Sequence, residues 1–259
     1  MTYPQLSSGA VSQFPVRKLR YSRTVVNRTA DGRVIKRPDT TAQITEWQLQ
    51  YSLLSDAELA TLQQFFNSMS GSLNGFTFLD PCGNLLAWSD ELSQTTWQKD
   101  PLITLTGGVA DPAGGQNGWT LVNTGTGPQG VSQVLNSPGG YVYCLSVYAQ
   151  ATQPTSAVLS IAGQSSTVAV ETGWNRVAIT GTGSPSATSV AIGFQLAAGA
   201  SMTLYGPQLE PQASPSAYQS STTGGVYQNA RFRDDTFTFS STDVNRNFAT
   251  VNILYVNHL

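Results

Sequence analysis

The chain has 259 residues, of which 11% are charged and 40% hydrophobic, and its formal net charge is −2 at pH 7. This length accommodates two domains of ordinary size or one large β domain, and the hydrophobic share is enough for a core. The near-neutral charge excludes a general attraction to nucleic acid or to an anionic membrane. Few charges with abundant Gly, Ser and Thr are typical of a polar β protein rather than of a disordered chain.

The basic residues divide the chain into three segments. Residues 1–82 carry eight of the thirteen Lys and Arg residues, residues 83–225 carry two, and residues 226–259 carry three. The two outer segments are therefore alike, and the middle segment differs from both.

The first segment begins with two strand-like stretches, Arg23–Val26 and Gln43–Leu54. In the second stretch alternate residues fall on opposite faces, because side chains of a strand point to alternate sides of its sheet. We expect the core face to be the one that carries Thr45, Trp47, Leu49 and Tyr51.

A single helix is predicted for the whole chain, in the stretch SDAELATLQQFFNSMSG. Ser55 is a good N-cap, and Glu58 three residues later completes a capping box. Gly71 suits the position after the helix, and the strand Gly75–Leu79 follows. The apolar stripe at helical spacing consists of Leu59, Leu62, Phe66 and Met69, with Phe65 beside it and available to another subunit.

The middle segment has no helical periodicity and many short alternating runs separated by turn residues. Such spacing predicts an antiparallel β-sandwich. The expected strands are Tyr141–Ala149, Ala157–Ile161, Ser166–Val170, Asn175–Thr180, Ser189–Leu196 and Met202–Leu209.

The third segment contains two further strand-like runs, Thr236–Ser240 and Ala249–Val256. It is too short for a core of its own and needs a partner, for which the first segment is the natural choice. Insertions are tolerated at exposed turns where the ends of the inserted domain lie close together. We therefore predict a mainly β protein with a discontinuous β-barrel or sandwich domain with one helix, residues 1–83 and 225–259, and an inserted domain, residues 84–224.

The residues argue against catalysis. The single histidine, His258, is next to the C-terminus, a poor place to hold a general base. No Gly-rich stretch has the spacing of a phosphate-binding loop. A carboxylate pair for glycoside hydrolysis, Glu171 with Glu210, is the remaining enzymatic alternative. We expect no enzymatic activity and no cofactor.

Cys82 and Cys144 are too few for a disulfide framework and lack metal-ligand spacing, so reduced thiols are expected and a single bridge is the alternative. No metal site is predicted, although Asp90, Glu91 and Glu210 are oxygen donors for a structural calcium ion. The N-terminal residues have neither a basic nor an apolar region, so we expect no signal peptide, and no apolar run suits membrane insertion.

Glycan sites on β-sandwiches use aromatic platforms with flanking amides. For each aromatic residue taken singly, a place in the core or a scattered surface position is the stronger interpretation. The candidate glycan-binding residues are Trp119, Tyr141, Tyr143, Tyr205 and Gln208, with Tyr148 and Gln129 as further members.

The outer segments resemble the distal tail protein family of long-tailed phages and gene transfer agents. The features are an early FP, the strand RYSRTVV, the stretch EWQLQY, the capped helix SDAELATLQQFF, the strand-turn GFTFLDP and a late RFRDD. The order of these features carries the resemblance. It implies a structural virion protein that forms a ring, usually hexameric, and joins the tail tube to the tip or baseplate.

The middle segment resembles a jelly-roll domain of the carbohydrate-binding-module type that occurs in phage particle proteins. The blocks are NLLAWSDELSQTTWQK, GWNRVAIT and LYGPQLEPQASPSAY. The resemblance implies a domain that projects from the ring and binds host-surface polysaccharide. A free carbohydrate-binding protein without a tail role is the alternative.

The basic first segment has two interpretations, a subunit interface or a ring lumen through which DNA passes. Acidic residues lie among the basic ones in this segment and favour the interface. In that case DNA passes through the lumen without being bound by these side chains. The resemblance implies a homo-oligomer, with tail tube and tail tip proteins as neighbours, assembled in the host cytoplasm and located in the virion tail. The candidate interface residues are Arg17, Arg20, Arg23, Arg28, Arg33 and Arg37.

Overall fold

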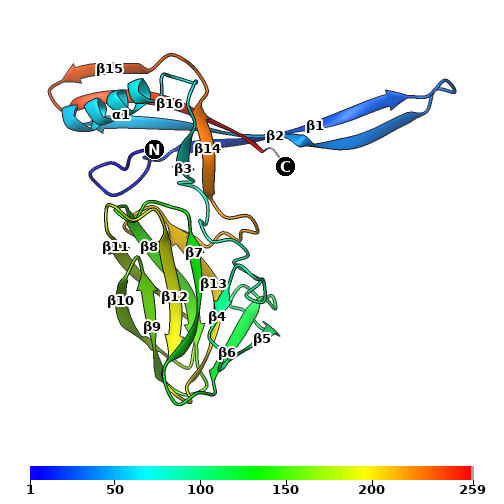
Figure 1. Cartoon of the computed structure of the whole chain (residues 1–259), viewed down its shortest axis with the longest axis vertical. Coiled ribbons are helices and arrows are strands. Elements are labelled where there is room, and N and C mark those ends of the chain that lie inside the picture. Colours follow the sequence, from blue (N-terminus) through cyan, green and yellow to red (C-terminus); the bar gives the residue numbers. More distant parts are fainter. Residues whose placement is uncertain (258–259) are drawn as a thin grey trace. The chain divides into compact units, whose positions relative to one another are not determined.

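The computed structural model describes residues 1–257, with the side chains of residues 40–42 left out (Figure 1). The chain divides into two compact units. Unit 1 comprises Met1–Leu6, Ser12–Phe78 and Tyr227–Leu259, and unit 2 comprises Ser7–Val11 and Leu79–Val226. The short Ser7–Val11 segment belongs to unit 2, which the composition did not indicate. That each unit folds as an independent domain stays a prediction.

Unit 1 is built on one sheet of six strands. The strand order is β1-β2-β16-β14-β3, and β15 pairs with β16 beside β14. The strands of this sheet are β1 (Val16–Arg28), β2 (Val34–Leu54), β3 (Phe76–Leu79), β14 (Val226–Phe232), β15 (Thr238–Asp243) and β16 (Arg246–Asn257).

The predicted core face of β2 is confirmed. Trp47, Leu49 and Tyr51 are all buried, and they lie beside Val251 and Ile253 of β16. Alternate positions on β2 and β16 are more exposed, as expected for strands whose two faces differ. Both strands are longer than predicted, and β1 extends well beyond Arg23–Val26.

Helix α1 (Asp56–Ser68) has the predicted capping box. The Ser55 hydroxyl accepts from the Glu58 amide nitrogen at 3.2 Å, and the Glu58 carboxylate accepts from the Ser55 amide nitrogen at 2.9 Å. Leu59 and Leu62 are buried, as the stripe predicts. In the described part of the chain α1 is the only helix, and it is too short to cross a membrane.

The position of the Phe65 ring differs from the one expected. We expected it to be available to another subunit, but it contacts the rings of Tyr3, Phe76 and Phe232 within unit 1, at centroid distances of 5.6, 5.2 and 5.9 Å. These contacts arise because the N-terminal residues run beside β3, where the Tyr3 amide nitrogen donates to the Thr77 carbonyl oxygen.

Unit 2 is an antiparallel sandwich of two five-stranded sheets, which agrees with the predicted jelly-roll class. The first sheet has the order β10-β9-β12-β7-β4 and the second has the order β11-β8-β13-β6-β5. The strands are β4 (Gln98–Lys99), β5 (Ile103–Val109), β6 (Gly118–Asn123), β7 (Gln129–Leu135), β8 (Val142–Gln150), β9 (Thr155–Ile161), β10 (Gln164–Val170), β11 (Asn175–Thr182), β12 (Val190–Leu196) and β13 (Ser201–Glu210).

The core of unit 2 lies between its two sheets. Apolar side chains of every second position, such as Leu145 and Val147 on β8 and Ile192 and Phe194 on β12, are almost fully buried. The Trp97 ring is also buried and lies 6.3 Å from the Phe194 ring. Strands β5, β6 and β7 were not predicted, because Gly and polar residues interrupt the alternation there.

Candidate functional site

Unit 1 carries a two-stranded arm, which we define as residues 23–39. Within the described residues, β16 pairs with β2 up to the Asn257–Gln43 pair, and β1 and β2 continue beyond it as a ribbon (Figure 1). The register of the arm runs from the Arg23–Asp39 pair to the Arg28–Val34 pair. A two-stranded ribbon with no third strand or helix over it is marginally stable in water.

The arm exposes apolar side chains next to basic ones. Val26 is 52% exposed, Val34 is 46% exposed and Ile35 is 43% exposed. The register places Val26 opposite Lys36 and Val25 opposite Arg37. Each face of the ribbon therefore combines aliphatic surface with positive charge, a composition that suits a protein interface better than bulk water.

The predicted interface arginines all lie on β1, on β2 or in the turn between them, and all are exposed. Arg23 pairs with Asp39 at 2.5 Å, and Arg33 pairs with Asp31 at 3.1 Å. Arg28 and Arg37 make no hydrogen bond or ion pair within the described residues. The six side chains are Arg17, Arg20, Arg23, Arg28, Arg33 and Arg37.

Unit 2 has a groove on the outer face of its first sheet. Register pairs place Gln98 opposite Ser132, Ser132 opposite Gly193, Gly193 opposite Ser160 and Ser160 opposite Ser165. One row of small or polar residues thus crosses all five strands. The hollow has a volume of about 330 Å³, and Asp100, Gly130 and Gln195 also line it.

Two glycines keep this groove open. A Cβ atom on Gly193 would lie 2.8 Å from the Ser160 hydroxyl, and one on Gly130 would lie 2.2 Å from the Phe194 carbonyl oxygen. Ser132 and Ser160 make no side-chain hydrogen bond within the described residues. Hydroxyl and amide groups in a shallow channel can bind the hydroxyl groups of a sugar chain, although no aromatic platform lines this one.

The candidate glycan residues do not lie in this groove. Tyr143 is fully buried and its hydroxyl donates to the Pro138 carbonyl oxygen at 2.6 Å. Gln208 is 1% exposed, and its amide group binds the backbone at Ala217 and Gln219. Both predictions are wrong, because a buried side chain whose polar atoms are satisfied by its own chain presents no surface to a glycan.

Trp119 and Tyr141 are partly exposed at the ends of strands. The Trp119 indole nitrogen donates to the Asp90 carbonyl oxygen at 3.0 Å, and its ring packs on Gly107. The Tyr141 ring lies 6.4 Å from the ring of Tyr143. Burial, followed by the nearby Tyr143, raises the pKa of the Tyr141 phenol above its ordinary value. Both side chains thus contribute mainly to packing.

Tyr205 belongs to an aromatic cluster on the outer face of the second sheet. Its ring lies 5.9 Å from Tyr148 and 5.2 Å from Tyr218, and the Arg176 guanidinium lies 5.4 Å from the centre of the Tyr148 ring. Burial, followed by the charges of Asp111 and Asp90, raises the pKa of the Tyr205 phenol. Arg176 and Tyr218 were not among the predicted site residues. Arg176 lies far from Tyr205 along the chain, and Tyr218 lies outside the predicted strands.

The segment after β13 covers part of this cluster. Arg176 donates to the Ser216 carbonyl oxygen and to the Ser146 hydroxyl, and the Thr180 hydroxyl donates to the Ala213 carbonyl oxygen. Gln129, the remaining candidate, accepts from the Leu102 amide nitrogen at 3.1 Å. The five-residue glycan set therefore does not come together at one place.

The three acidic residues named above as oxygen donors for calcium each accept hydrogen bonds from neighbouring residues. Glu210 is buried and accepts from the Ser216 amide nitrogen and hydroxyl, Asp90 accepts from the Tyr218 hydroxyl, and Glu91 accepts from Ser93. Among residues 1–257, no group of three or more His, Cys, Asp or Glu side chains has the arrangement of a metal site. His258 lies outside the described residues. Cys82 and Cys144 form no disulfide bond with each other.

No protein-family model matches the chain, and no curated protein matches it. Similar solved structures include the enzymatically active domain of tailspike protein 4 of bacteriophage CBA120, at 17% identity and a TM-score of 0.38 over 51% of this chain and 22% of that one. The CBM22-1 xylan-binding domain of Paenibacillus barcinonensis Xyn10C is 16% identical, with a TM-score of 0.39 over 51% of this chain and 96% of that domain.

A further xylan-binding domain, from CBM22, is 13% identical, with a TM-score of 0.41 over 53% of this chain and 100% of that domain. The match to the tailspike domain thus spans only 22% of that domain's length. At these identities and scores the likenesses to carbohydrate-binding modules and to a phage tailspike carry no argument about activity, ligand or assembly.

Proposed function

We propose that the chain is a structural subunit of a ring at the distal end of a phage-type tail, which joins the tail tube to the tip or baseplate. The single observation that carries the proposal is the arm, residues 23–39, whose valines and Ile35 are exposed in the single chain. Such a ribbon becomes stable when another surface covers it. The order of motifs in the outer segments, which resembles that of distal tail proteins, supports the same assembly.

Six copies in the ring, tail tube and tip proteins as neighbours, assembly in the host cytoplasm and a place in the virion tail all form part of this proposal. DNA passes through the lumen without specific binding. The subunit acts without a cofactor and without catalysis, because assembly requires only complementary surfaces.

Immunogold electron microscopy of particles tests the tail role. Antibody raised against residues 84–224 should label one end of the tail. Label on no particle, with the protein free in the supernatant, would contradict the proposal and favour the free carbohydrate-binding protein.

The groove of unit 2 supports a second function, binding of a host-surface polysaccharide. The side-chain hydroxyl groups of Ser132 and Ser160 and the amide group of Gln195 line the hollow and make no hydrogen bond within the described residues. Polar groups that lack protein partners are available to hydrogen-bond a ligand.

Affinity electrophoresis of the protein in gels that contain host polysaccharide tests this binding. Ser160→Phe should fill the middle of the groove and abolish the retardation, and Gln195→Ala should weaken it. Thr106→Phe, an exposed position on β5 of the other sheet, is the matched control and should leave the retardation unchanged. Equal retardation of all variants would exclude the groove as the glycan site.

A further inference from the structure

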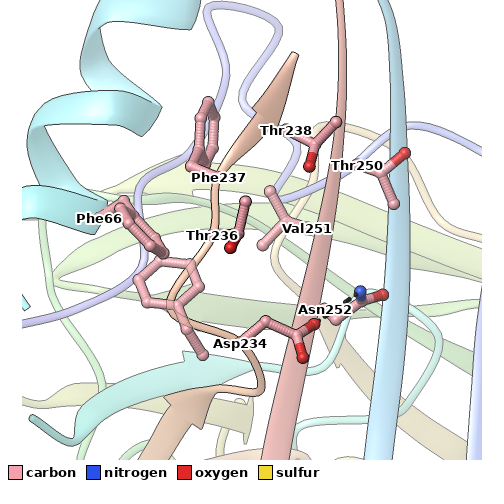
Figure 2. Close-up of a pocket in the computed structure, with 9 residues that line it drawn as sticks. Phe66, Asp234, Thr236, Phe237, Thr238, Thr250, Val251 and Asn252 are labelled. Atoms are coloured by element: carbon pink, nitrogen blue, oxygen red, sulfur yellow. Dashed lines mark hydrogen bonds between the residues drawn. The ribbon is translucent and has the colours of Figure 1, made fainter. Parts of the chain in front are cut away.

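A hollow in unit 1 lies where two strands leave a gap beside β16. Phe232 of β14 pairs with Ile253, and the next pair is Thr238 of β15 with Thr250. The Arg233 backbone nitrogen still donates to the Asn252 carbonyl oxygen at 2.9 Å, and residues 234–237 span the gap between these pairs. The hollow that results has a volume of about 340 Å³ (Figure 2).

The wall of this hollow is aromatic. The Phe66 ring of α1 lies 4.9 Å from the Phe232 ring and 5.6 Å from the Phe237 ring. Threonine side chains from the bulge, β15 and β16 complete the lining, and Figure 2 shows the Asp234 carboxylate beside Asn252. The negative faces of such rings attract a flat cation.

Two of the residues that line this hollow, Asp234 and Asn252, carry side-chain oxygen acceptors. The side-chain nitrogen of Asn252, Nδ2, donates to Asp234 Oδ2 at 3.2 Å, and this bond fixes the orientation of the side-chain amide group. Its other atom, Asn252 Oδ1, is buried and has no hydrogen-bond partner in the described part of the chain. A buried acceptor without a donor costs free energy, so a ligand that donates to it gains affinity.

The combination of aromatic rings, a carboxylate and an unsatisfied amide oxygen suits an arginine side chain. A guanidinium group is planar, permanently charged and carries five N–H donors, whereas an ammonium group is compact and more strongly hydrated. We propose that this hollow receives an arginine from the arm of a second copy of the chain. This inference rests on the assembly proposed above and names the two surfaces that meet in it.

The arm provides matching side chains. Arg28 and Arg37 are exposed and have no partner among the described residues, and valines lie beside each of them. The arm carries more basic than acidic residues, whereas the charged side chain that lines the hollow is Asp234, and the neighbouring Arg233 is paired with Glu46. The charges and the apolar surfaces of the two sites are therefore complementary.

The arm of the same copy cannot occupy the hollow. Arg28 pairs with Val34 near the tip, whereas Asn252 pairs with Gln48, further along the same strand β2. At ~3.3 Å per residue, these positions are about 45 Å apart along one continuous strand. The contact must therefore join two copies. Repeated head to tail, this contact is heterologous and gives a ring when its rotation closes, whereas two copies that exchange arms reciprocally give a dimer.

A mixing experiment on the full chain tests this pairing. Variant one carries Asp234→Lys, which places a cation in the hollow and leaves the arm intact. Variant two carries Arg28→Ala and Arg37→Ala, which removes these two cations from the arm and leaves the hollow intact. Native mass spectrometry and analytical ultracentrifugation measure the assemblies of each variant and of their equimolar mixture.

We expect the wild type to form higher oligomers and each variant alone to associate at least tenfold more weakly. The mixture should give one-to-one dimers and nothing larger, because only the arm of variant one and the hollow of variant two remain functional. Glu171→Gln and Arg246→Glu, both at exposed positions, are the charge controls and should assemble like the wild type.

Other outcomes separate this inference from the proposed function. Oligomers of both variants equal to those of the wild type would overturn the arm–hollow contact while leaving a ring possible through other surfaces. A wild type that stays monomeric, with immunogold label still at the tail end, would also overturn the contact but not the tail role. Circular dichroism of each variant checks that the sheet is intact.

Discussion

The amide nitrogen of Asp80 donates a hydrogen bond to the carbonyl oxygen of Gly225 at 2.9 Å. The chain thus enters and leaves the main part of unit 2 at one place, although the two residues are far apart in sequence. Next to this bond, Leu85 donates to the Leu209 carbonyl oxygen and Ser89 donates to the Ser221 carbonyl oxygen. The entering and departing segments are therefore held side by side by backbone hydrogen bonds.

This closure predicts that unit 2 folds without unit 1. A fragment of residues 79–226 should unfold in a single cooperative transition, because it keeps both sheets, the core between them and the bond from Asp80 to Gly225. Differential scanning calorimetry measures the transition. The shorter fragment 84–224, which lacks that bond, should melt at a lower temperature. A fragment 79–226 without a heat-absorption peak would show that these residues depend on the rest of the chain, which includes the Ser7–Val11 segment of unit 2.

The side chain of Asn84 should be important for the stability of unit 2. It is buried, its Oδ1 accepts from the amide nitrogens of Leu86 and Leu209, and its Nδ2 donates to the Pro207 carbonyl oxygen at 2.8 Å. Asn84→Ala leaves these backbone groups without partners, at a cost of about 2–4 kcal/mol. Urea unfolding of fragment 79–226 measures the change.

Asn175→Ala is the matched control, because Asn175 is exposed at the start of β11. We expect it to change the free energy of unfolding by less than about 0.5 kcal/mol. Equal effects of the two substitutions would mean that the Asn84 bonds contribute nothing to stability.

Asp111 should make the stability of unit 2 dependent on acid pH. Its carboxylate accepts from the amide nitrogens of Asn117, Gly115 and Ala113, and the first of these bonds is the main cause of the lowered pKa of its carboxyl group. The pKa is lower in the folded state, so the ionised group stabilises the fold above about pH 4. This contribution is lost as the pH falls through the folded-state pKa.

Melting temperatures of the wild type and Asp111→Asn, measured between pH 7 and pH 2, test this dependence. Asp111→Asn should melt lower at neutral pH, and the gap should narrow at acid pH. Glu171→Gln, at an exposed position, should show a constant difference from the wild type throughout. A gap for Asp111→Asn that does not change with pH would contradict the assignment.

The capping box of α1 should contribute to the stability of unit 1. Ser55→Ala removes the acceptor of the Glu58 amide nitrogen and should cost about 1 kcal/mol. Thr61→Ala, on the exposed side of the same helix, should be neutral or slightly stabilising, because alanine has the higher helix propensity. Chemical unfolding of the full chain, followed by circular dichroism, compares the two, and a larger loss for Thr61→Ala would contradict the role of the cap.

Local patterns in the sequence were sufficient for several elements. The cap residues Ser55 and Glu58 lie three positions apart and bond to each other's backbone, so their chemistry needs no distant partner. The alternation around Trp47 indicated the buried face of β2, because neighbouring side chains of a strand point to opposite sides. The Gly-interrupted strands β5 to β7 had no such pattern and were missed.

The candidate site depended on contacts that sequence could not supply. Alternation cannot tell which face of β8 is buried, so Tyr143 remained a candidate glycan residue although a place in the core was the stronger interpretation. In β13 the register shifts between Tyr205 and Gln208, where Gly206 has a φ of +61°. This shift interrupts the alternation of side chains between the two faces of the strand, so the position of Gln208 could not be predicted. The groove of unit 2 is formed mainly by serines and glycines from four strands, with Gln98 of β4 at the end of the row, and none of these residues is distinctive in sequence.

The sequence by itself determined the mainly β character, the single capped helix and the contrast between the basic outer segments and the neutral middle, because these follow from composition and from neighbours along the chain. Only the tertiary structure decided that the exposed arginines lie on an arm without a core, and that Asp234 and Asn252 meet beside aromatic rings from α1 and β14. The physical reason is that both features depend on strand pairing. The ribbon is exposed where, among the described residues, no third strand pairs with β2, and the hollow lies where neither β14 nor β15 pairs with β16. The pairing of β1 with β2 beyond the described part of β16, and the gap between Phe232 and Thr238, both depend on partners distant in the chain.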